Sequence, residues 1–304
     1  MTPRSGQQYR IASSGYVAEI ASVGASLRSL AFEGRDLVVP FDADEVRPNY
    51  RGTTLAPWPN RVVDGAYSFA GESHQLALTE PERGQALHGL LAWADFAPVF
   101  ADSDRVALVA EISPQAGYPF RVEVTSEYRV GPEGLTQTVT ARNIGADAAP
   151  WGTGPHPYLR AGDGRVDDWS LALPADEVLT VTPERLSPVA LEPVTAHAEW
   201  DFRAERPIGD VFIDHAFTGL SRTDGIAEVR VTSADGRGVA ISWDEACPWV
   251  QVHTADTPPV EASHRVGLAV EPMTCAPDAF NSGEGLIVLE PGDESGAGWT
   301  IRAL

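Results

Sequence analysis

Residues 121–142 read Arg-Val-Glu-Val-Thr-Ser-Glu-Tyr-Arg-Val-Gly-Pro-Glu-Gly-Leu-Thr-Gln-Thr-Val-Thr-Ala-Arg. Apolar and polar residues alternate on both sides of the break at Gly131-Pro132. An alternation with a period of two is typical of a strand that buries one face and exposes the other. The stretch therefore predicts two strands separated by a turn.

The same pattern recurs over most of the chain. Ala227–Thr232 and Gly238–Trp243 flank Ser-Ala-Asp-Gly and predict a β-hairpin. Further strand-like runs cover residues 106–112, 170–173, 249–254, 266–270, 286–289 and 298–303. No long segment has a helical period of 3.6 residues, and the irregular stretch 183–207 is predicted to be a loop over one sheet. Many short strands with frequent turns predict an all-β fold, a large antiparallel β-sandwich, with residues 1–304 as a single domain.

Composition restricts the classes of partner. The 304 residues carry 43 Asp and Glu against 22 Lys and Arg, a formal net charge of -21. This charge repels phosphate backbones and anionic lipids, so we expect no nucleic acid and no membrane partner. General solubility explains the charge equally well, and a neutral small molecule is compatible with it. The sequence lacks a long apolar run and an apolar signal segment near its start, which predicts a cytoplasmic protein.

Several residue types point to chemistry or exclude it. Lys is absent, which excludes Schiff-base chemistry and phosphate binding by a Walker lysine. Cys247 and Cys275 match no metal or redox spacing and are expected to be free thiols. No pair of His residues has the spacing of a convincing metal site, so no metal is expected.

Two residues are candidates for proton transfer. His156 lies in Gly152-Thr-Gly-Pro-His-Pro-Tyr158, which predicts a stiff, exposed turn, and imidazole titrates near neutrality. Glu271 follows the apolar run 266–270 and precedes Pro272, which predicts a place at the rim of the sandwich. Partial burial there would raise the pKa of Glu271 and make it a competent base. The alternatives are a surface histidine and a solvated charge at a strand end.

Two further residues suit the binding of hydroxyl groups. Arg61 follows the Pro57-Trp-Pro59 turn and offers a planar fork of donors, although a surface ion pair is the alternative. Asp214 interrupts an apolar run, where it either binds hydroxyls or caps a turn.

Taken in order, eight short segments resemble the aldose 1-epimerase (galactose mutarotase) family, in a bacterial subgroup. They are Pro57-Trp-Pro-Asn-Arg61, Gly65-Ala-Tyr-Ser-Phe-Ala-Gly71, Leu87-His-Gly89, His156-Pro-Tyr158, Phe212-Ile-Asp214, Val250-Gln-Val-His-Thr254, Val270-Glu-Pro-Met-Thr274 with Pro277-Asp-Ala-Phe-Asn281, and Leu289-Glu-Pro-Gly292. Each segment alone is weak, and their common order makes the resemblance specific.

The resemblance implies a galactose mutarotase-like supersandwich and an isomerase that interconverts the α and β anomers of a free aldose. It implies Glu271 as the base and His156 as the acid, which we expect to face each other across a sugar-sized gap. It also implies a set of substrate-binding residues: Asn60, Arg61, His88, Asp214, Gln251 and Tyr158. No metal or organic cofactor is implied. The expected partner is a monosaccharide, and the expected assembly is a monomer or homodimer.

The sequence departs from the family pattern at two places. The catalytic turn reads His156-Pro-Tyr-Leu-Arg160 where Phe-Asn is usual after Tyr, and Glu271 is followed by Pro rather than Thr. Galactose preference therefore does not follow from the resemblance. The alternatives are a non-catalytic carbohydrate-binding protein, an epimerase of a hexose 6-phosphate with Arg160 on the phosphate, and a glycosidase that uses Glu271 and Asp214.

Overall fold

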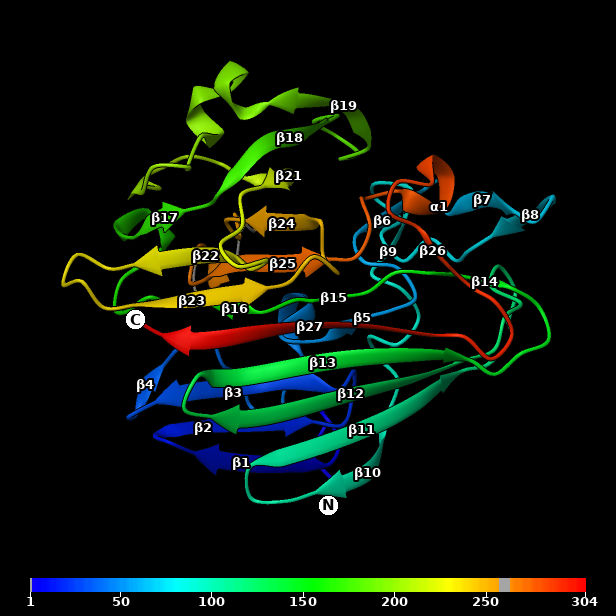
Figure 1. The fold of residues 1–304 in the computed structure, drawn as a ribbon, viewed down its shortest axis with the longest axis horizontal. Coiled ribbons are helices and arrows are strands. Elements are labelled where there is room, and N and C mark those ends of the chain that lie inside the picture. The colour runs from blue at the N-terminus through cyan, green and yellow to red at the C-terminus, as the bar shows by residue number, and fades with distance from the viewer. Residues whose placement is uncertain (1, 257–262) are drawn as a thin grey trace.

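The computed structural model describes residues 2–256 and 263–304, and these form antiparallel sheets with very little helix (Figure 1). The largest sheet has nine strands, which follow one another in this order: β10 (Ala97–Ala101), β11 (Arg105–Ile112), β12 (Val122–Gly131), β13 (Gly134–Asn143), β27 (Glu294–Ala303), β23 (Gly238–Trp243), β22 (Ala227–Thr232), β17 (Ser170–Ala172) and β20 (Arg206–Pro207). The all-β class predicted from the sequence is confirmed.

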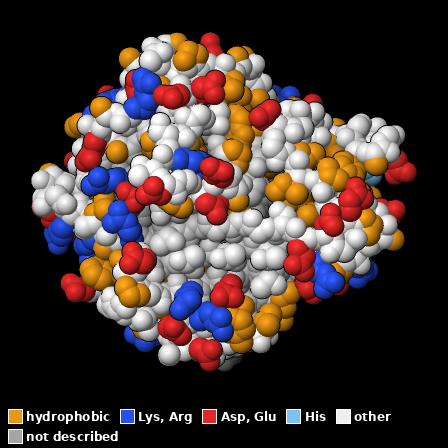
Figure 2. Space-filling model, viewed as in Figure 1, with side chains coloured by type: hydrophobic (Ala, Val, Ile, Leu, Met, Phe, Trp, Pro, Cys, Tyr) orange, Lys and Arg blue, Asp and Glu red, His pale blue; other side chains and the backbone are white. Residues whose placement is uncertain are grey.

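The predicted alternation fixes which side chains enter the core. In β13, Leu135, Val139 and Ala141 are buried, whereas Thr138 and Arg142 are exposed. β12 and β13 pair from Val122↔Asn143 to Gly131↔Gly134, and β22 pairs with β23 as the predicted hairpin. Figure 2 shows charged side chains around a central band of this face that carries uncharged polar side chains and backbone.

A second layer is built by the first strands of the chain. β1 (Gln8–Ser13), β2 (Tyr16–Ala21), β3 (Ser26–Phe32) and β4 (Arg35–Asp36) form a four-stranded sheet in this order. In this layer β1 and β2 contact β12, and Figure 1 shows the blue strands of the layer behind the green ones. Ile11, Ile20 and Leu30 are among the fully buried side chains of the core.

The third sheet has six strands and carries most of the residues discussed below. Its order is β16 (Tyr158–Leu159), β25 (Leu268–Met273), β24 (Trp249–His253), β21 (Asp214–Leu220), β18 (Ala175–Val181) and β19 (Pro188–Pro193). The expectation that residues 183–207 form a loop is wrong for β19, which pairs with β18. Prolines bound β19, and a strand at the edge of a sheet accommodates them because one side of its backbone needs no partner.

Short elements connect the sheets. Four pairs are two-stranded: β14 (Ala149–Trp151) with β26 (Ile287–Leu289), β15 (Gly154–Pro155) with β5 (Thr54–Leu55), β6 (Arg61–Val63) with β9 (Gln85–Leu87), and β7 (Ala66–Phe69) with β8 (Glu72–Gln75). The helices are α1 (Ala279–Ser282) and the 3₁₀ turns Pro48–Tyr50, Val166–Asp168, Val194–Ala196 and Ala198–Trp200. Within the described residues, no helix has the length and apolar character needed to cross a membrane.

Candidate active site

Three neighbouring strands of the six-stranded sheet present polar side chains to one cavity. Gln251 of β24 lies opposite Glu271 of β25, and His253 of β24 lies opposite Asp214 of β21. Because side chains two residues apart in a strand share a face, Gln251 and His253 point to the same side. All four residues line a cavity of about 340 Å³, a size near the lower end of ligand pockets, which run from about 300 to 1,000 Å³.

Glu271 lies inside a strand and not at the rim that the sequence analysis expected. β25 continues through Pro272 to Met273, and Glu271 is only 2% exposed. β16 pairs with Leu268 and Ala269, and beyond them the backbone nitrogens of Val270 and Thr274 donate to the carbonyl oxygens of Pro157 and Thr153. Pro272 has no N–H to donate, and its neighbours in β25 keep the strand attached on both sides of it.

His156 is buried, which corrects the expectation of an exposed turn. It lies between β15 and β16, each of which pairs with a different strand, and its side chain is 6% exposed. Its carbonyl oxygen accepts a hydrogen bond from the backbone nitrogen of Gly52 at 2.7 Å. The two strand pairings and the bond from Gly52 therefore hold this turn, with its imidazole, inside the molecule.

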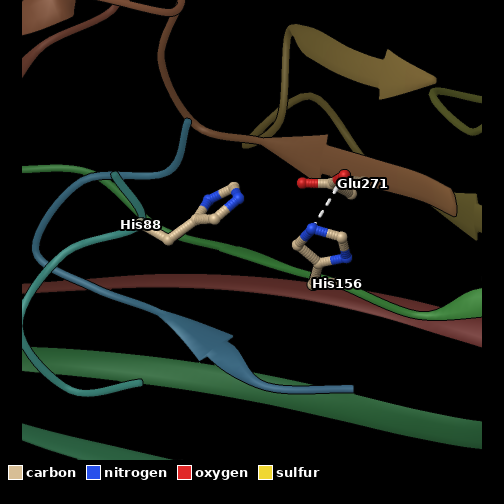
Figure 3. Close-up of side chains that lie close together, drawn as sticks. All are labelled: His88, His156 and Glu271. Carbon is tan, nitrogen blue, oxygen red and sulfur yellow. Dashed lines mark ion pairs between the residues drawn. The ribbon is translucent and has the colours of Figure 1, made fainter. Parts of the chain in front are cut away.

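His156 and Glu271 are in direct proximity (Figure 3). Nε2 of His156 lies 3.5 Å from Oε1 of Glu271, and the ring of His88 lies 4.9 Å from that of His156 between centroids. The expectation of a sugar-sized gap between the two groups is wrong, because no pyranose ring fits into 3.5 Å. The two side chains instead lie next to each other in the wall of the cavity.

Burial changes the proton affinity of these groups. Desolvation raises the pKa of Glu271 well above its ordinary value, and the charge of Asp214 adds to this while Arg61 opposes it. Desolvation is the main cause that lowers the pKa of His156 to about 3, and the neighbouring His253 acts in the same direction. The pKa of His88 is also lowered well below its ordinary value, first by burial and then by His156. Burial thus favours the neutral form of both groups, protonated Glu271 and unprotonated His156.

Asn60, Arg61 and His88 reach the cavity from the β6–β9 pair. Arg61 lies opposite Leu87, and the backbone nitrogen of His88 donates to the carbonyl oxygen of Asn60 at 2.8 Å. Arg61 donates to Glu80 from Nε at 2.7 Å and from Nη2 at 3.0 Å, and both side chains are only 11% exposed. Arg61 thus forms an ion pair, which was the alternative to hydroxyl binding. The pair lies in the cavity wall and not at the surface.

The remaining predicted residues also line the cavity. Asp214 accepts a hydrogen bond from Nε2 of Gln251 at 2.7 Å. Burial alone would raise the pKa of Asp214, but the neighbouring His253 and the positive charge of Arg61 bring it below its ordinary value. The ring of Tyr158 stacks on His156 at 5.2 Å between centroids, and burial raises its pKa.

The sequence analysis missed several cavity residues: Asn49, Tyr50, Thr79, Glu80, Glu82 and His253. His253 had a usable signal, since it lies two residues from Gln251 on a predicted strand. Glu80 and Tyr50 had none, because only the tertiary fold brings them to Arg61 and His88. Tyr50 packs edge-on against His88, with ring centroids 4.8 Å apart.

Arg160 and His215 lie away from the cavity. Arg160 forms an ion pair with Asp36 at 3.3 Å and lines a separate cleft with Arg35 and Arg237. The suggestion that Arg160 binds the phosphate of a substrate in this cavity is therefore wrong. His215 follows Asp214 in β21 and so points to the opposite face, where its ring lies 4.0 Å from that of Trp200.

The cavity also contains a group of potential metal ligands. His88, His156 and Glu271 each offer a ligand atom, and these atoms lie within 4.8 Å of one another. The spacing of residues along the chain does not reveal this group, because its members lie on three distant segments.

The chain is similar in sequence or in fold to several known proteins. The chain is 37% identical over 289 residues to an Escherichia coli (strain K12) protein described as uncharacterized protein YihR, an alignment that covers 95% of this chain and 90% of that one. A GalM/aldose epimerase homologue from C. elegans has a similar fold, with a TM-score of 0.85, 21% identity, and coverage of 98% of this chain and 99% of that chain. A galactose 1-epimerase from Lactobacillus acidophilus has a TM-score of 0.79 at 19% identity, with 96% and 92% coverage. The sequence profile of aldose 1-epimerase matches residues 7–302, so the chain belongs to the aldose 1-epimerase family.

Proposed function

We propose that this protein is an isomerase that interconverts the α and β anomers of a free, uncharged aldose, with residues 1–304 acting as one domain. Glu271 and His156 are the catalytic pair. The observation that carries the proposal is the 3.5 Å approach of His156 Nε2 to Glu271 Oε1 in the wall of a small polar cavity.

A neighbouring acid and base suit the chemistry of ring opening. The C1 hydroxyl must lose a proton while the ring oxygen O5 gains one, and both oxygens are bonded to the same carbon. Two groups on one side of the sugar can therefore reach both oxygens at once. In this mechanism the pair carries one proton and reacts in the form that has the proton on His156. Glu271 then takes the proton of the C1 hydroxyl while His156 gives its proton to O5, after which the aldehyde rotates and the steps reverse. The pair ends with the one proton with which it began, and no cofactor takes part.

The single shared proton predicts the dependence of activity on pH. On the acid side, activity falls only where the pair takes up a second proton, and the pKa of His156 is lowered to about 3. On the alkaline side, activity falls where the pair loses its only proton, and the pKa of Glu271 is raised well above its ordinary value. We therefore expect kcat/KM to show a broad plateau through neutrality instead of a narrow bell. A peak narrower than two pH units would contradict the shared proton.

Six residues are proposed to hold the sugar. The hydrogen bonds to Glu80 use Nε and Nη2 of Arg61, which leaves Nη1 for a sugar oxygen. Asp214 and Gln251 accept from and donate to hydroxyl groups, and Asn60, His88 and Tyr158 complete the wall. An uncharged sugar is favoured because Glu80, Glu82, Asp214 and Glu271 surround a cavity in which Arg61 is the only arginine among the described lining residues.

Polarimetry of freshly dissolved α-anomers of glucose, galactose, xylose and arabinose tests the proposal. The protein should accelerate mutarotation of at least one of them, and EDTA should leave the rate unchanged. Glu271→Gln and His156→Asn should each lower kcat by about 100-fold or more with a smaller effect on KM.

Three outcomes would replace the proposal. Sugar binding without accelerated mutarotation identifies a carbohydrate-binding protein. Hydrolysis of aryl glycosides that Glu271→Gln and Asp214→Asn both abolish identifies a glycosidase. Wild-type kcat in a folded Glu271→Gln variant, as judged by circular dichroism, removes Glu271 from the mechanism.

A further inference from the structure

We infer that His253 is a specificity-determining residue, which binds one hydroxyl group of the sugar at a ring position remote from C1. This inference rests on the proposed function and adds to it a residue that neither the sequence analysis nor the family resemblance assigned to the site.

The position of His253 in the sheet places it on the substrate side. It lies in β24, two residues beyond Gln251, and is paired with Asp214 of β21 on one side and Ala269 of β25 on the other. Glu271 is paired with Gln251, one step along the same face. If C1 of the sugar lies at Glu271, the ring atoms away from C1 extend along this face toward Asp214 and His253.

The two ring nitrogens of His253 have different surroundings. Nδ1 is buried, forms no hydrogen bond with the described residues, and lies 3.8 Å from Oδ2 of Asp214. The Asp214 carboxylate favours a proton on Nδ1, since a negative charge attracts the N–H dipole. Nε2, on the other side of the ring, is then a free acceptor, and the side chain is 24% exposed at the cavity.

The neighbouring groups make this acceptor selective. Asp214 has one carboxylate oxygen engaged by Gln251 at 2.7 Å, which fixes the carboxylate and, through it, the favoured orientation of the imidazole. The titratable side chains that act on Asp214 here are His253, Arg61 and His215. Nε2 of His253, held in this way, accepts a hydrogen bond from a sugar hydroxyl that points toward it. The epimer with the opposite configuration at that carbon leaves Nε2 without a partner and should bind less well.

Three substitutions separate this function from a structural one. His253→Gln keeps a polar group near the position of Nε2, His253→Asn keeps one near Nδ1, and His253→Phe keeps only a flat ring. If Nε2 binds a hydroxyl, Phe and Asn should lower kcat/KM by about tenfold, mainly through KM, and Gln should restore most of it. If His253 only supports Asp214, Asn should restore activity and Gln should not, which would overturn the inference.

A panel of monodeoxy sugars gives an independent readout. One deoxy sugar lacks the hydroxyl that His253 binds, and with this sugar His253→Phe should no longer lower kcat/KM. With the other deoxy sugars the loss in kcat/KM should persist. The comparison is a double-mutant cycle in which one change is in the enzyme and the other in the substrate. An equal loss on every sugar would overturn the inference while leaving the proposed function intact. Absence of mutarotation by the wild-type protein on the whole panel would instead overturn the proposed function.

Discussion

At the scale of single residues, a buried carboxyl group such as Glu271 works against the stability of the fold. Burial raises its pKa in the folded protein above the value in the unfolded chain, so the folded state binds the proton more tightly. The corresponding stability is complete below the unfolded pKa and is lost as the pH rises toward the folded pKa. A group kept ionisable at such a cost is expected where a reaction uses it.

We therefore predict that Glu271→Gln raises the melting temperature while it abolishes turnover. Gln keeps the shape and carries no charge, so the gain should be small at pH 4.5 and reach about 2 °C or more at pH 8. Thermal unfolding followed by circular dichroism at both pH values measures it. Glu123→Gln, at an exposed position of β12, is the control and should show no such difference. If Glu271→Gln is less stable than the wild type at pH 8, the buried carboxylate does not destabilise the folded protein and the prediction is wrong.

The eight site residues named from the family resemblance all line the cavity, but the sequence did not predict how they lie. Pro155 and Pro157 indicated an exposed turn around His156, yet β5 and β25 pair with the strands on either side and bury it. These pairings join segments about 100 residues apart, and local sequence carries no information on such contacts. Glu80 escaped notice for the same reason, since its bond to Arg61 depends on the tertiary fold.

At the scale of elements, β15 packs closely on β25 beside the point where His156 approaches Glu271. A Cβ atom on Gly154 would lie 2.6 Å from the backbone carbonyl oxygen of Pro272, next to Glu271. His156 is two residues from Gly154, so any separation of these strands moves the imidazole away from the carboxyl group. The alternation of apolar and polar side chains along the strands was predictable from the sequence. The close approach of β15 to β25 follows only from how the strands pack.

We predict that Gly154→Ala lowers kcat by at least tenfold and destabilises the protein by about 1–3 kcal/mol, because a backbone atom cannot give way as a side chain can. Mutarotation rates and urea unfolding measure the two effects. Gly131→Ala is the matched control, since a Cβ atom there would meet no atom within 4 Å. Wild-type kcat in Gly154→Ala would show that the pair tolerates a change in strand spacing.

At the scale of the whole molecule, net charge and cavity charge have the same sign. The chain carries a formal charge of -21, and four carboxyl groups line the cavity with one arginine among the described residues. Long-range repulsion lowers the local concentration of anionic ligands and leaves neutral sugars unaffected. The net negative charge by itself indicated only solubility. Together with the carboxyl groups of the cavity, it favours neutral sugars over anionic ones.

This charge arrangement predicts how salt acts on different substrates. For a neutral aldose, kcat/KM should change less than twofold between 10 mM and 300 mM NaCl. For a hexose 6-phosphate it should be at least tenfold lower at low salt and rise with added salt, because ions screen charges beyond about 10 Å at 0.1 M. Glu82→Gln, which removes an exposed carboxyl group at the cavity, should raise only the rate with the phosphorylated sugar. Polarimetry of glucose and glucose 6-phosphate at both salt concentrations measures this. If glucose 6-phosphate is the better substrate at low salt, the assignment of an uncharged substrate is wrong. A positively charged group outside the cavity lining must then bind the phosphate.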